Sequence, residues 1–342
     1  MPQTPMHTDT SPLLEIRNLQ THFFTHDGLV KAVDGVDLTI QPDRTLCVLG
    51  ESGCGKSITA RSVLRIVDQP GRIVGGEIIY RAADGRTVDL AAERPGSRRM
   101  REVRGKDIAM IFQEPMSSLG PITRIGQQIS ETILLHRKVT KAEAREIAIE
   151  MLDKVGIPDP TGRYMAYPFE LSGGMRQRAM IAMALSCQPR LLIADEPTTA
   201  LDVTTQAQIL DLIAELKEEL NMAVMLITHD LGVVAEVAED VAVMYMGKVV
   251  EYGDVHDIFA NPQHPYTRAL MASIPRIGAE RRDRLPAIRG MVPHPLSRPS
   301  GCSFRTRCDH AIPGVCDQSE PKLQPAGPTK SACFLHDQKV TS

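Results

Sequence analysis

The sequence predicts an α/β fold built around a strand, a glycine-rich loop and a helix, to which antiparallel strands, a helical insert and a small C-terminal extension are added. Three features carry this prediction. The apolar run 46–49 leads directly into the loop Gly50–Ser57, and a helical pattern follows the loop. Alternating apolar and polar residues around turn signals predict hairpins over 14–40 and 75–90. A further apolar run at 191–197 adds another buried strand to the core.

Length and composition limit what the chain can build. With 342 residues, 42% of them hydrophobic and 24% charged, it can bury a substantial core and fold into two or three lobes. The net charge of −3 shows no basic excess, so we expect no nucleic-acid partner. Residues 1–12 lack the charged and apolar regions of a signal peptide, and nowhere do about 18 apolar residues follow one another. We therefore expect a cytosolic chain with a flexible N-terminus at 1–12.

The glycine-rich loop reads GESGCGKS and has the P-loop form GxxxxGK[ST]. In this form, glycines let successive backbone N–H groups face phosphates, Lys56 adds a positive charge, and the Ser57 hydroxyl can ligate Mg²⁺. A chance match is the alternative, at roughly one chain in a hundred of this length. Because strand, loop and helix come in the required order, we predict nucleotide binding. The predicted contacts are Gly50, Ser52, Gly53, Cys54, Gly55, Lys56 and Ser57.

The first hairpin is predicted from two alternating runs, Leu14–Phe24 and Val30–Ile40, separated by the turn signal His26–Gly28. Phe23 lies at the end of the first run, and an aromatic ring held near a P-loop can stack on adenine. The alternative is a core position, which is common for an aromatic residue on a strand. We keep Phe23 as a candidate adenine contact.

The second hairpin, Gly75–Leu90, is predicted to turn at Asp84–Gly85. After it comes the arginine-rich stretch Arg94–Arg104, which we interpret as a solvated linker, with phosphate contacts as the alternative. A short apolar strand, Ile108–Phe112, then leads to Gln113. The role of this glutamine depends on the other motifs.

Residues 126–156 are predicted to be a helical insert, whose second helix begins with a capping box formed by Thr140 and Glu143. The insert leads into the sequence LSGGMRQR at 171–178, just ahead of another helical pattern. Such a helix start exposes backbone N–H groups at the positive end of the helix dipole. The residues predicted to form this second anion site are Ser172, Gly173 and Gly174.

The run LLIADEP at 191–197 is a predicted buried strand that ends in two adjacent carboxylates. In P-loop proteins, an acidic residue at this place holds the Mg²⁺ shell, and a second one can take a proton from an attacking water. Asp195 suits the first role and Glu196 the second. The alternative, acidic residues that merely close a strand, fits a single carboxylate better than a pair.

A helix, a strand and a hairpin complete this part of the chain. Ala200–Asp202 precedes the amphipathic helix Val203–Leu220, and the buried strand Ala223–Ile227 ends just before His229. This histidine could cap the strand, but ligands in α/β proteins also lie at the ends of parallel strands. The final hairpin is predicted over 241–252.

With these motifs together, residues from about 13 to 253 resemble the nucleotide-binding subunit of an ATP-binding cassette (ABC) transporter. The resemblance rests on six motifs in the family's order and approximate spacing. They are the Walker A loop Gly50–Ser57, the Q-loop Gln113, the signature LSGGM at 171–175, the Walker B strand 191–197, the D-loop Ala200–Asp202 and the switch His229. Met175 departs from the commonest signature, which ends in glutamine, and this weakens any inference about the rate.

The resemblance implies that two cassettes pair head to tail, with ATP between the Walker A loop of one and the signature of the other. Ser172–Gly174 and Asp202 would then contact ATP across the pair. Glu196 is implied as the general base, with His229 and Gln113 as further catalytic residues. The residues implied to hold Mg²⁺ are Ser57, Gln113 and Asp195.

Other functions of P-loop proteins are alternatives. ABC ATPases also act in DNA repair, in chromosome structure and on ribosomes, but those chains usually carry coiled coils, zinc insertions or tandem cassettes. A P-loop enzyme outside the ABC family, such as a small-molecule kinase, would leave LSGGM, Asp202 and His229 unexplained. We therefore expect ATP binding and hydrolysis that power transport.

The segment 261–274 resembles one that follows the cassette in importers of dipeptides, oligopeptides and nickel. The resemblance implies a peptide importer, with a nickel or other small-solute importer as the alternative. It also implies a second, different ATPase subunit, two transmembrane permeases and an extracytoplasmic substrate-binding protein as partners. The chain would then lie peripherally on the cytoplasmic face of the membrane.

An extension at 256–342 is expected to follow a cassette at 13–255, whose helical subdomain occupies about 114–170. Four of the seven cysteines fall within 32 residues of this extension, where an even spread would place fewer than one. Their gaps of 5, 7 and 16 residues differ from the short CxxC pairs usual in structural zinc sites. Some peptide-importer ATPases that this chain resembles carry a [4Fe–4S] cluster there, so the resemblance implies an iron–sulfur cluster. Arg305 and Arg307 could favour the thiolate forms of the cysteines. Zinc or free thiols are the alternatives. The implied ligands are Cys302, Cys308, Cys316 and Cys333.

Overall fold

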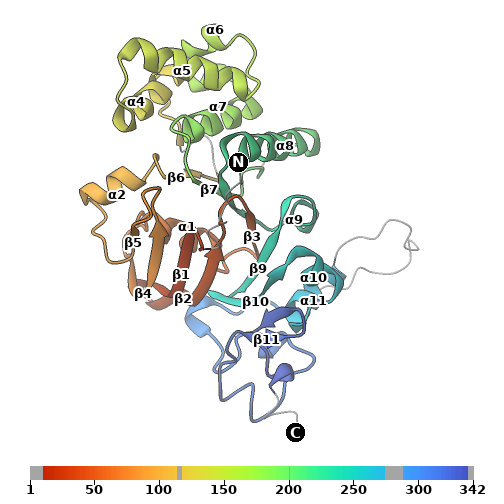
Figure 1. Ribbon diagram of the computed structural model, residues 1–342. Coiled ribbons are helices and arrows are strands. Elements are labelled where there is room, and N and C mark those ends of the chain that lie inside the picture. Colours follow the sequence, from red (N-terminus) through yellow and green to blue (C-terminus); the bar gives the residue numbers. More distant parts are fainter. Residues whose placement is uncertain (1–10, 114–117, 200, 274–287, 338–342) are drawn as a thin grey trace, which may run out of the picture.

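Figure 1 shows the chain as a computed structural model, which describes residues 11–113, 118–199, 201–273 and 288–337. Parts of four sequence predictions lie outside the described residues: most of the flexible N-terminus, the start of the helical subdomain, Ala200 of the D-loop, and sections of the C-terminal extension. Over the described ranges, no helix has both the length and the apolar character needed to cross a membrane.

An eight-stranded mixed sheet forms the centre of the described fold. Its parallel part has the order β9-β3-β8-β7-β6, and the antiparallel strands β10, β12 and β11 continue it beyond β9. The bounds are β3 Thr45–Leu49, β6 Ile108–Ile111, β7 Leu191–Asp195, β8 Ala223–Thr228, β9 Asp240–Tyr245, β10 Lys248–Asp254, β11 Gln324–Ala326 and β12 Thr329–Ser331. The predicted strands before and after the glycine-rich loop are confirmed, including the β9–β10 hairpin.

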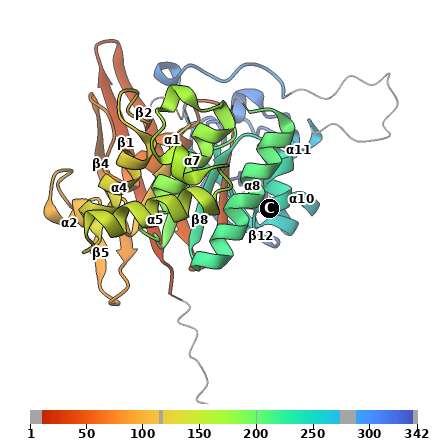
Figure 2. The same cartoon turned by 90° about the horizontal axis from the view of Figure 1, so that it is seen from above.

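A smaller antiparallel sheet has the strand order β2-β1-β4-β5. Its bounds are β1 Leu14–Thr25, β2 Gly28–Ile40, β4 Gly71–Arg81 and β5 Thr87–Asp89. Thr25 pairs with Gly28 and Arg81 pairs with Thr87, which confirms both predicted hairpins. Figure 2 shows that these red and orange strands stand together on one side of the molecule, away from α8 and α10.

The helices α4 to α7 form a separate group, drawn in yellow and green at the top of Figure 1. At the start of α5, the Thr140 hydroxyl accepts from the Glu143 N–H and the Glu143 carboxylate accepts from the Thr140 N–H, which confirms the predicted capping box. The helix bounds are α1 Lys56–Val63, α2 Arg98–Val103, α4 Ile125–His136, α5 Lys141–Lys154, α6 Pro160–Tyr164, α7 Gly173–Leu185, α8 Val203–Leu220, α9 Leu231–Val237, α10 Val255–Ala260 and α11 Pro265–Ala272. Short 3₁₀ turns lie at Pro168–Glu170, Pro295–Ser297, Arg305–Arg307 and Phe334–His336.

Strand β3 separates two hydrophobic clusters because its side chains alternate between the two faces of the sheet. Cys47 and Leu49 pack in the cluster that includes α7 and α8, whereas Leu46 and Val48 pack in the cluster that includes β1 and β2. All four side chains are at most 1% exposed. The strand that leads into the glycine-rich loop is therefore fixed on both faces.

The interpretation of Arg94–Arg104 as a solvated linker is wrong. Residues Arg98–Val103 form helix α2. Met100 is fully buried and Val103 is 5% exposed, so both side chains belong to the core. The Arg98 side chain, in contrast, is 89% exposed. Charge alone misled the prediction, because two apolar residues three positions apart are enough to bury one face of a helix this short.

The C-terminal extension joins the main sheet, since β12 pairs with β10 and Glu251 lies opposite Ser331. Glu251 is fully buried. Its carboxylate accepts hydrogen bonds from the Gln263 N–H at 2.6 Å, the His264 N–H at 2.9 Å and the Thr329 hydroxyl at 3.0 Å. A buried carboxylate is stable only with such donors, so it ties β10 to the start of α11 and to β12.

His264 gives a prediction about stability and pH. Its ring is 1% exposed, its Nδ1 accepts from the Tyr266 N–H at 3.0 Å, and burial lowers its pKa to about 3. The unfolded chain takes up this proton near pH 6.5, so the free energy of unfolding falls between about pH 6.5 and pH 3, by up to about 1.4 kcal/mol per unit. His264→Asn keeps a helix-cap acceptor and removes the titration. We expect its urea midpoint to change less than that of the parent between pH 7 and pH 5.

The control for this experiment is His256→Asn, at an exposed position in α10. This variant should keep the pH dependence of the parent. If His264→Asn also kept it, His264 would not be the source of this pH dependence.

Candidate active site

The glycine-rich loop connects β3 to α1 and packs directly against backbone on two sides. A Cβ atom added at Gly50 would lie 2.2 Å from the Met244 carbonyl oxygen in β9, and one added at Gly55 would lie 2.3 Å from the Ala32 carbonyl oxygen in β2. Gly55 also has a φ of 103°, in the region that favours glycine. These two glycines are therefore required by the space that the loop occupies.

Lys56 opens helix α1 with its side chain turned back over the loop. It is 4% exposed, and its amine donates to the carbonyl oxygens of Gly50 at 2.7 Å and Glu51 at 3.2 Å. The Cys54 sulfur lies 3.9 Å from the same amine, and burial raises the pKa of this thiol. The loop thus encloses one fixed positive charge beside a protonated, space-filling thiol.

Ser57 and Asp195 are 138 positions apart in the sequence and lie side by side in the structure. The Ser57 hydroxyl donates to Asp195 Oδ1 at 2.8 Å. Asp195 is 2% exposed, and burial raises the pKa of its carboxyl, although the hydrogen bond from Ser57 acts in the opposite direction. Hydroxyl and carboxylate oxygens are ligands that Mg²⁺ prefers, with water and phosphate oxygens completing its shell. The pair fits a Mg²⁺ site beside the loop.

Glu196 holds its carboxylate among three polar side chains. Its Oε2 accepts from Gln113 Nε2 at 3.1 Å and from the Thr199 hydroxyl at 3.0 Å. Its Oε1 lies 3.4 Å from His229 Nδ1. The backbone of Glu196 has a φ of 47°, which is uncommon for a residue with a side chain and is found often at functional sites. The chain accepts this conformation where β7 ends, and the carboxylate turns toward the loop.

The glycine-rich loop, Gln113, Glu196 and His229 line one hollow with a volume of about 490 Å³. They come from the carboxyl ends of β3, β6, β7 and β8, which are neighbours in the parallel part of the sheet. Ligands of parallel α/β sheets bind at this edge. The predicted site residues that line the hollow are Gly50, Ser52, Gly53, Cys54, Gly55, Lys56, Ser57, Gln113, Glu196 and His229. The structure therefore brings four separate motifs to one place.

Two other predicted motifs lie at helix starts outside this hollow. The Ser172 hydroxyl caps α7 by accepting from the Met175 N–H at 3.3 Å, and the Asp202 carboxylate caps α8 by accepting from the Thr205 N–H at 3.0 Å. A Cβ added at Gly174 would lie 3.2 Å from the Thr205 side chain. The signature residues and Asp202 are therefore neighbours, and they do not line the hollow of their own chain.

Phe23 also lies away from the hollow. Its ring packs against Gly71, where an added Cβ would lie 2.6 Å from Phe23 Cε1. The next residue, Phe24, carries the guanidinium of Arg72 at 4.1 Å from its ring centre. An adenine contact by Phe23 stays a prediction, since the described lining does not include this residue.

Sequence reasoning missed three side chains at this site. Thr199 donates to Glu196, the Tyr266 hydroxyl accepts from the Glu51 N–H at 3.0 Å, and Arg307 pairs with the Glu51 carboxylate. Thr199 lies two residues after the run ADEP, so proximity in sequence could have suggested it. Tyr266 lies in the segment 261–274 and Arg307 beside the cysteines, but neither pattern indicates a contact with the loop, which both residues reach from far along the chain.

The expected iron–sulfur cluster is wrong for this structure. Within 11–113, 118–199, 201–273 and 288–337, no group of three or more His, Cys, Asp or Glu side chains is arranged to hold a metal ion. Four cysteines line one small space, but its volume is about 10 Å³. Burial raises the pKa of Cys302 and Cys333 to about 11, so both groups are protonated thiols in this structure. The cysteines concerned are Cys302, Cys308, Cys316 and Cys333.

The reason for the error lies partly in Arg307. It was expected to favour thiolates, but its guanidinium points to Glu51 instead. The C-terminal extension is therefore present, but its described residues form no metal site.

Two family models match the chain. The model described as "ABC transporter" matches residues 33–199, which include the glycine-rich loop and Glu196. The model described as "Oligopeptide/dipeptide transporter, C-terminal region" matches residues 250–316, from β10 into the extension.

Similar proteins agree with these matches. The protein named "Probable peptide ABC transporter ATP-binding protein y4tR" of Sinorhizobium fredii is 52% identical over 331 residues, which cover 96% of this chain and 96% of that protein. Among solved structures, cbiO1 of Clostridium perfringens, part of the ABC transporter complex cbiONQ, has a TM-score of 0.60 and 27% identity, covering 73% of this chain and 91% of that one. The dimeric ATP-binding cassette MJ0796, in a post-hydrolysis state bound to ADP and Pi, has a TM-score of 0.62. At 23% identity, over 71% of this chain and 98% of that one, it supports the fold alone.

Proposed function

This chain belongs to the ATP-binding proteins of ABC transporters, and we propose that the solutes whose import it powers are di- and oligopeptides. One observation carries the choice of peptides. Similarity to peptide transporter proteins continues through the C-terminal extension, both in the match over 250–316 and in the relative that covers 96% of the chain. Other ABC subunits share the cassette, and the segment at 261–274 resembles nickel importers as well. The choice of peptides is therefore supported by the descriptions of the C-terminal match and of the relative, both of which name peptides.

The hollow at the sheet edge supports the roles that we propose for its residues in ATP hydrolysis. The loop N–H groups and Lys56 would hold the phosphates of ATP. Glu196 would take a proton from the attacking water, because its carboxylate lines the hollow beside the loop and is held there by Gln113 and Thr199. His229 and Gln113, which contact that carboxylate, would orient it and sense the γ-phosphate.

A Mg²⁺ ion would be held by Ser57, Asp195 and Gln113, and when bound it would offset charge on the phosphates. The Ser57 hydroxyl that now donates to Asp195 would turn a lone pair toward the ion. Asp195 is buried at the strand end, so it gains a cation partner without moving into water.

We also propose that Ser172–Gly174 and Asp202 complete the ATP site of a second cassette. Their position supports this role, because the two helix starts lie together, outside the hollow of their own chain. N–H groups at the start of α7, which is 13 residues long, suit phosphate. The second cassette is proposed to be a different ATPase, which would make the pair a heterodimer.

The remaining partners are proposed to be two permeases and an extracytoplasmic substrate-binding protein, with this chain peripheral on the cytoplasmic face of the membrane. The permeases would contact the helical subdomain near 113–137, where Ile122 is 88% exposed and Leu135 is 73% exposed. In this organisation the cassette spans 13–255, the helical subdomain about 114–170 and the extension 256–342.

Co-expression tests this proposal. When the chain is produced with the two permeases and the ATPase encoded beside it, we expect one membrane complex containing all four proteins. We then place this complex in lipid discs and add the substrate-binding protein. The rate of ATP hydrolysis by the complex should rise when peptide is added, because the peptide-loaded binding protein would promote closure of the two cassettes.

The same complex with Glu196→Gln is the control for ATPase contaminants. Stimulation by Ni²⁺ and not by peptide would contradict the peptide assignment, and purification of the chain with DNA or ribosomes instead of permeases would contradict the transport role.

A further inference from the structure

The C-terminal extension reaches the glycine-rich loop through a buried arginine. Arg307 lies in the 3₁₀ turn Arg305–Arg307, and its two terminal nitrogens donate to the two carboxylate oxygens of Glu51 at 2.7 and 3.1 Å. The Arg307 side chain is 4% exposed and that of Glu51 is 28% exposed. A two-pronged, buried pair of this kind fixes orientation as well as distance.

Arg307 is itself held firmly. Its Nε donates to the Arg289 carbonyl oxygen at 3.0 Å. Its guanidinium lies 5.8 Å from the ring centre of Tyr245 and 6.0 Å from that of Phe304, and these two rings pack edge to face at 5.3 Å. The position of the guanidinium is therefore set by the extension and by β9 together.

Glu51 transmits this position into the loop because it is held at three points. Its N–H donates to the Tyr266 hydroxyl at 3.0 Å, its carbonyl oxygen accepts from the Lys56 amine at 3.2 Å, and its carboxylate accepts from Arg307. Lys56 is the cation that the loop offers to phosphate. A shift of Glu51 would therefore change both the backbone path of the loop and the place of this charge.

We propose that Arg307 is a positioning residue, through which the C-terminal extension sets the affinity of the loop for MgATP. Arg307 does not contact the hollow, so it acts by holding Glu51 and, through the Glu51 carbonyl, Lys56. The extension thus has a role in the ATPase cycle besides any contact it makes with other subunits. This inference rests on MgATP binding at the loop, which the proposed function includes.

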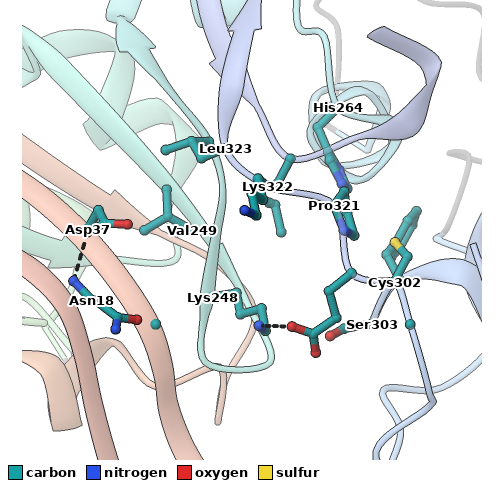
Figure 3. Close-up of a pocket in the computed structure, with 16 residues that line it drawn as sticks. Asn18, Asp37, Lys248, Val249, His264, Cys302, Ser303, Pro321, Lys322 and Leu323 are labelled. Atoms are coloured by element: carbon teal, nitrogen blue, oxygen red, sulfur yellow. Dashed lines mark hydrogen bonds and ion pairs between the residues drawn. The ribbon is translucent and has the colours of Figure 1, made fainter. Parts of the chain in front are cut away.

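Two ion pairs join the extension to other parts of the cassette. A hollow of about 480 Å³ lies between the extension and the strands of the cassette. Figure 3 shows Lys248 among its lining residues, and the Lys248 amine pairs with the Glu320 carboxylate. The Glu320 side chain is 50% exposed. A second ion pair joins Arg298 to Asp34 at 2.8 Å. Glu320 offers a matched control, because its loss removes an ion pair of the same interface without affecting Glu51.

The test compares Arg307→Gln, Glu51→Gln, the double variant and Glu320→Gln in the full chain. MgATP affinity is measured at equilibrium with a fluorescent ATP analogue, together with KM and kcat for hydrolysis. We expect Arg307→Gln to raise Kd and KM by about tenfold. This is the change in affinity expected when the free energy of one charge-assisted hydrogen bond is lost from MgATP binding. The kcat at saturating ATP should change much less, since no group that contacts the reacting atoms is altered.

Coupling within the pair provides the decisive comparison. The double variant should bind MgATP no more weakly than either single variant, because both act through one contact. It also leaves no buried unpaired charge, so it decides the result if Arg307→Gln fails to fold. Glu320→Gln should bind like the parent.

Two results would overturn the inference. One is MgATP binding by Arg307→Gln or the double variant that equals that of Glu320→Gln, and the other is a loss of kcat with KM unchanged. In both cases the parent would still bind MgATP, and the proposed function would stand. A parent chain that failed to bind MgATP would contradict the proposed function as well.

Discussion

Glu196→Gln should stop ATP turnover and leave ATP binding intact. The amide keeps the shape of the side chain and can still accept from Gln113 and Thr199, but it cannot take a proton from water. We expect kcat to fall by about 10²- to 10⁴-fold, the range for loss of a general base. The MgATP affinity should stay within about twofold, since the variant removes a group needed only in the transition state. Phosphate release and equilibrium binding of a fluorescent ATP analogue measure the two effects.

A trapped dimer is the second expected sign of this substitution. If ATP joins two cassettes and hydrolysis separates them, Glu196→Gln should accumulate as an ATP-bound pair with its partner ATPase, visible by size-exclusion chromatography. The control is Glu218→Gln on α8. The Glu218 side chain is 80% exposed and does not line the hollow. A Glu196→Gln chain that hydrolysed ATP as fast as Glu218→Gln would remove Glu196 from the catalytic role.

The edge of the sheet that carries the hollow could be predicted because each of its motifs is local. Gln113, Glu196 and His229 each follow a short apolar strand in the sequence, and parallel strands bring their carboxyl ends to one edge. The capping box at Thr140 is likewise complete within four residues. Motifs of this length have a defined local geometry, so their order along the chain was enough to predict where they lie.

The extension could not be predicted in the same way, because its contacts join distant segments. Glu251 holds residues from positions 263, 264 and 329, and Arg307 reaches back to Glu51. The number of cysteines was also a poor guide, because proximity of four thiols does not provide an open, charged cavity for a metal. Composition can suggest a metal site, but the arrangement of the side chains, which the spacing of cysteines in the sequence does not give, is what would form one.

The last prediction concerns Lys56, where the structure links binding to loop geometry. Lys56→Ala removes the amine that lies inside the loop, and it frees the carbonyl oxygens of Gly50 and Glu51 that the amine now satisfies. We expect MgATP affinity to fall by about 10- to 100-fold, which corresponds to roughly 1.5–3 kcal/mol for charged hydrogen bonds to phosphate.

Isothermal titration calorimetry with MgATP measures the loss of affinity caused by Lys56→Ala, and a thermal melt reports whether the variant is folded. Lys154→Ala is the matched control, because it also removes a lysine amine and its ion pair with Glu219, but on the helical group. Lys56 contributes to MgATP affinity only when Glu51 holds the loop in place. We therefore expect Arg307→Gln to lower MgATP affinity little further when Lys56→Ala is already present. Full additivity of the two substitutions, or MgATP affinity in Lys56→Ala equal to that of Lys154→Ala, would show that the amine and the pinned loop do not act together.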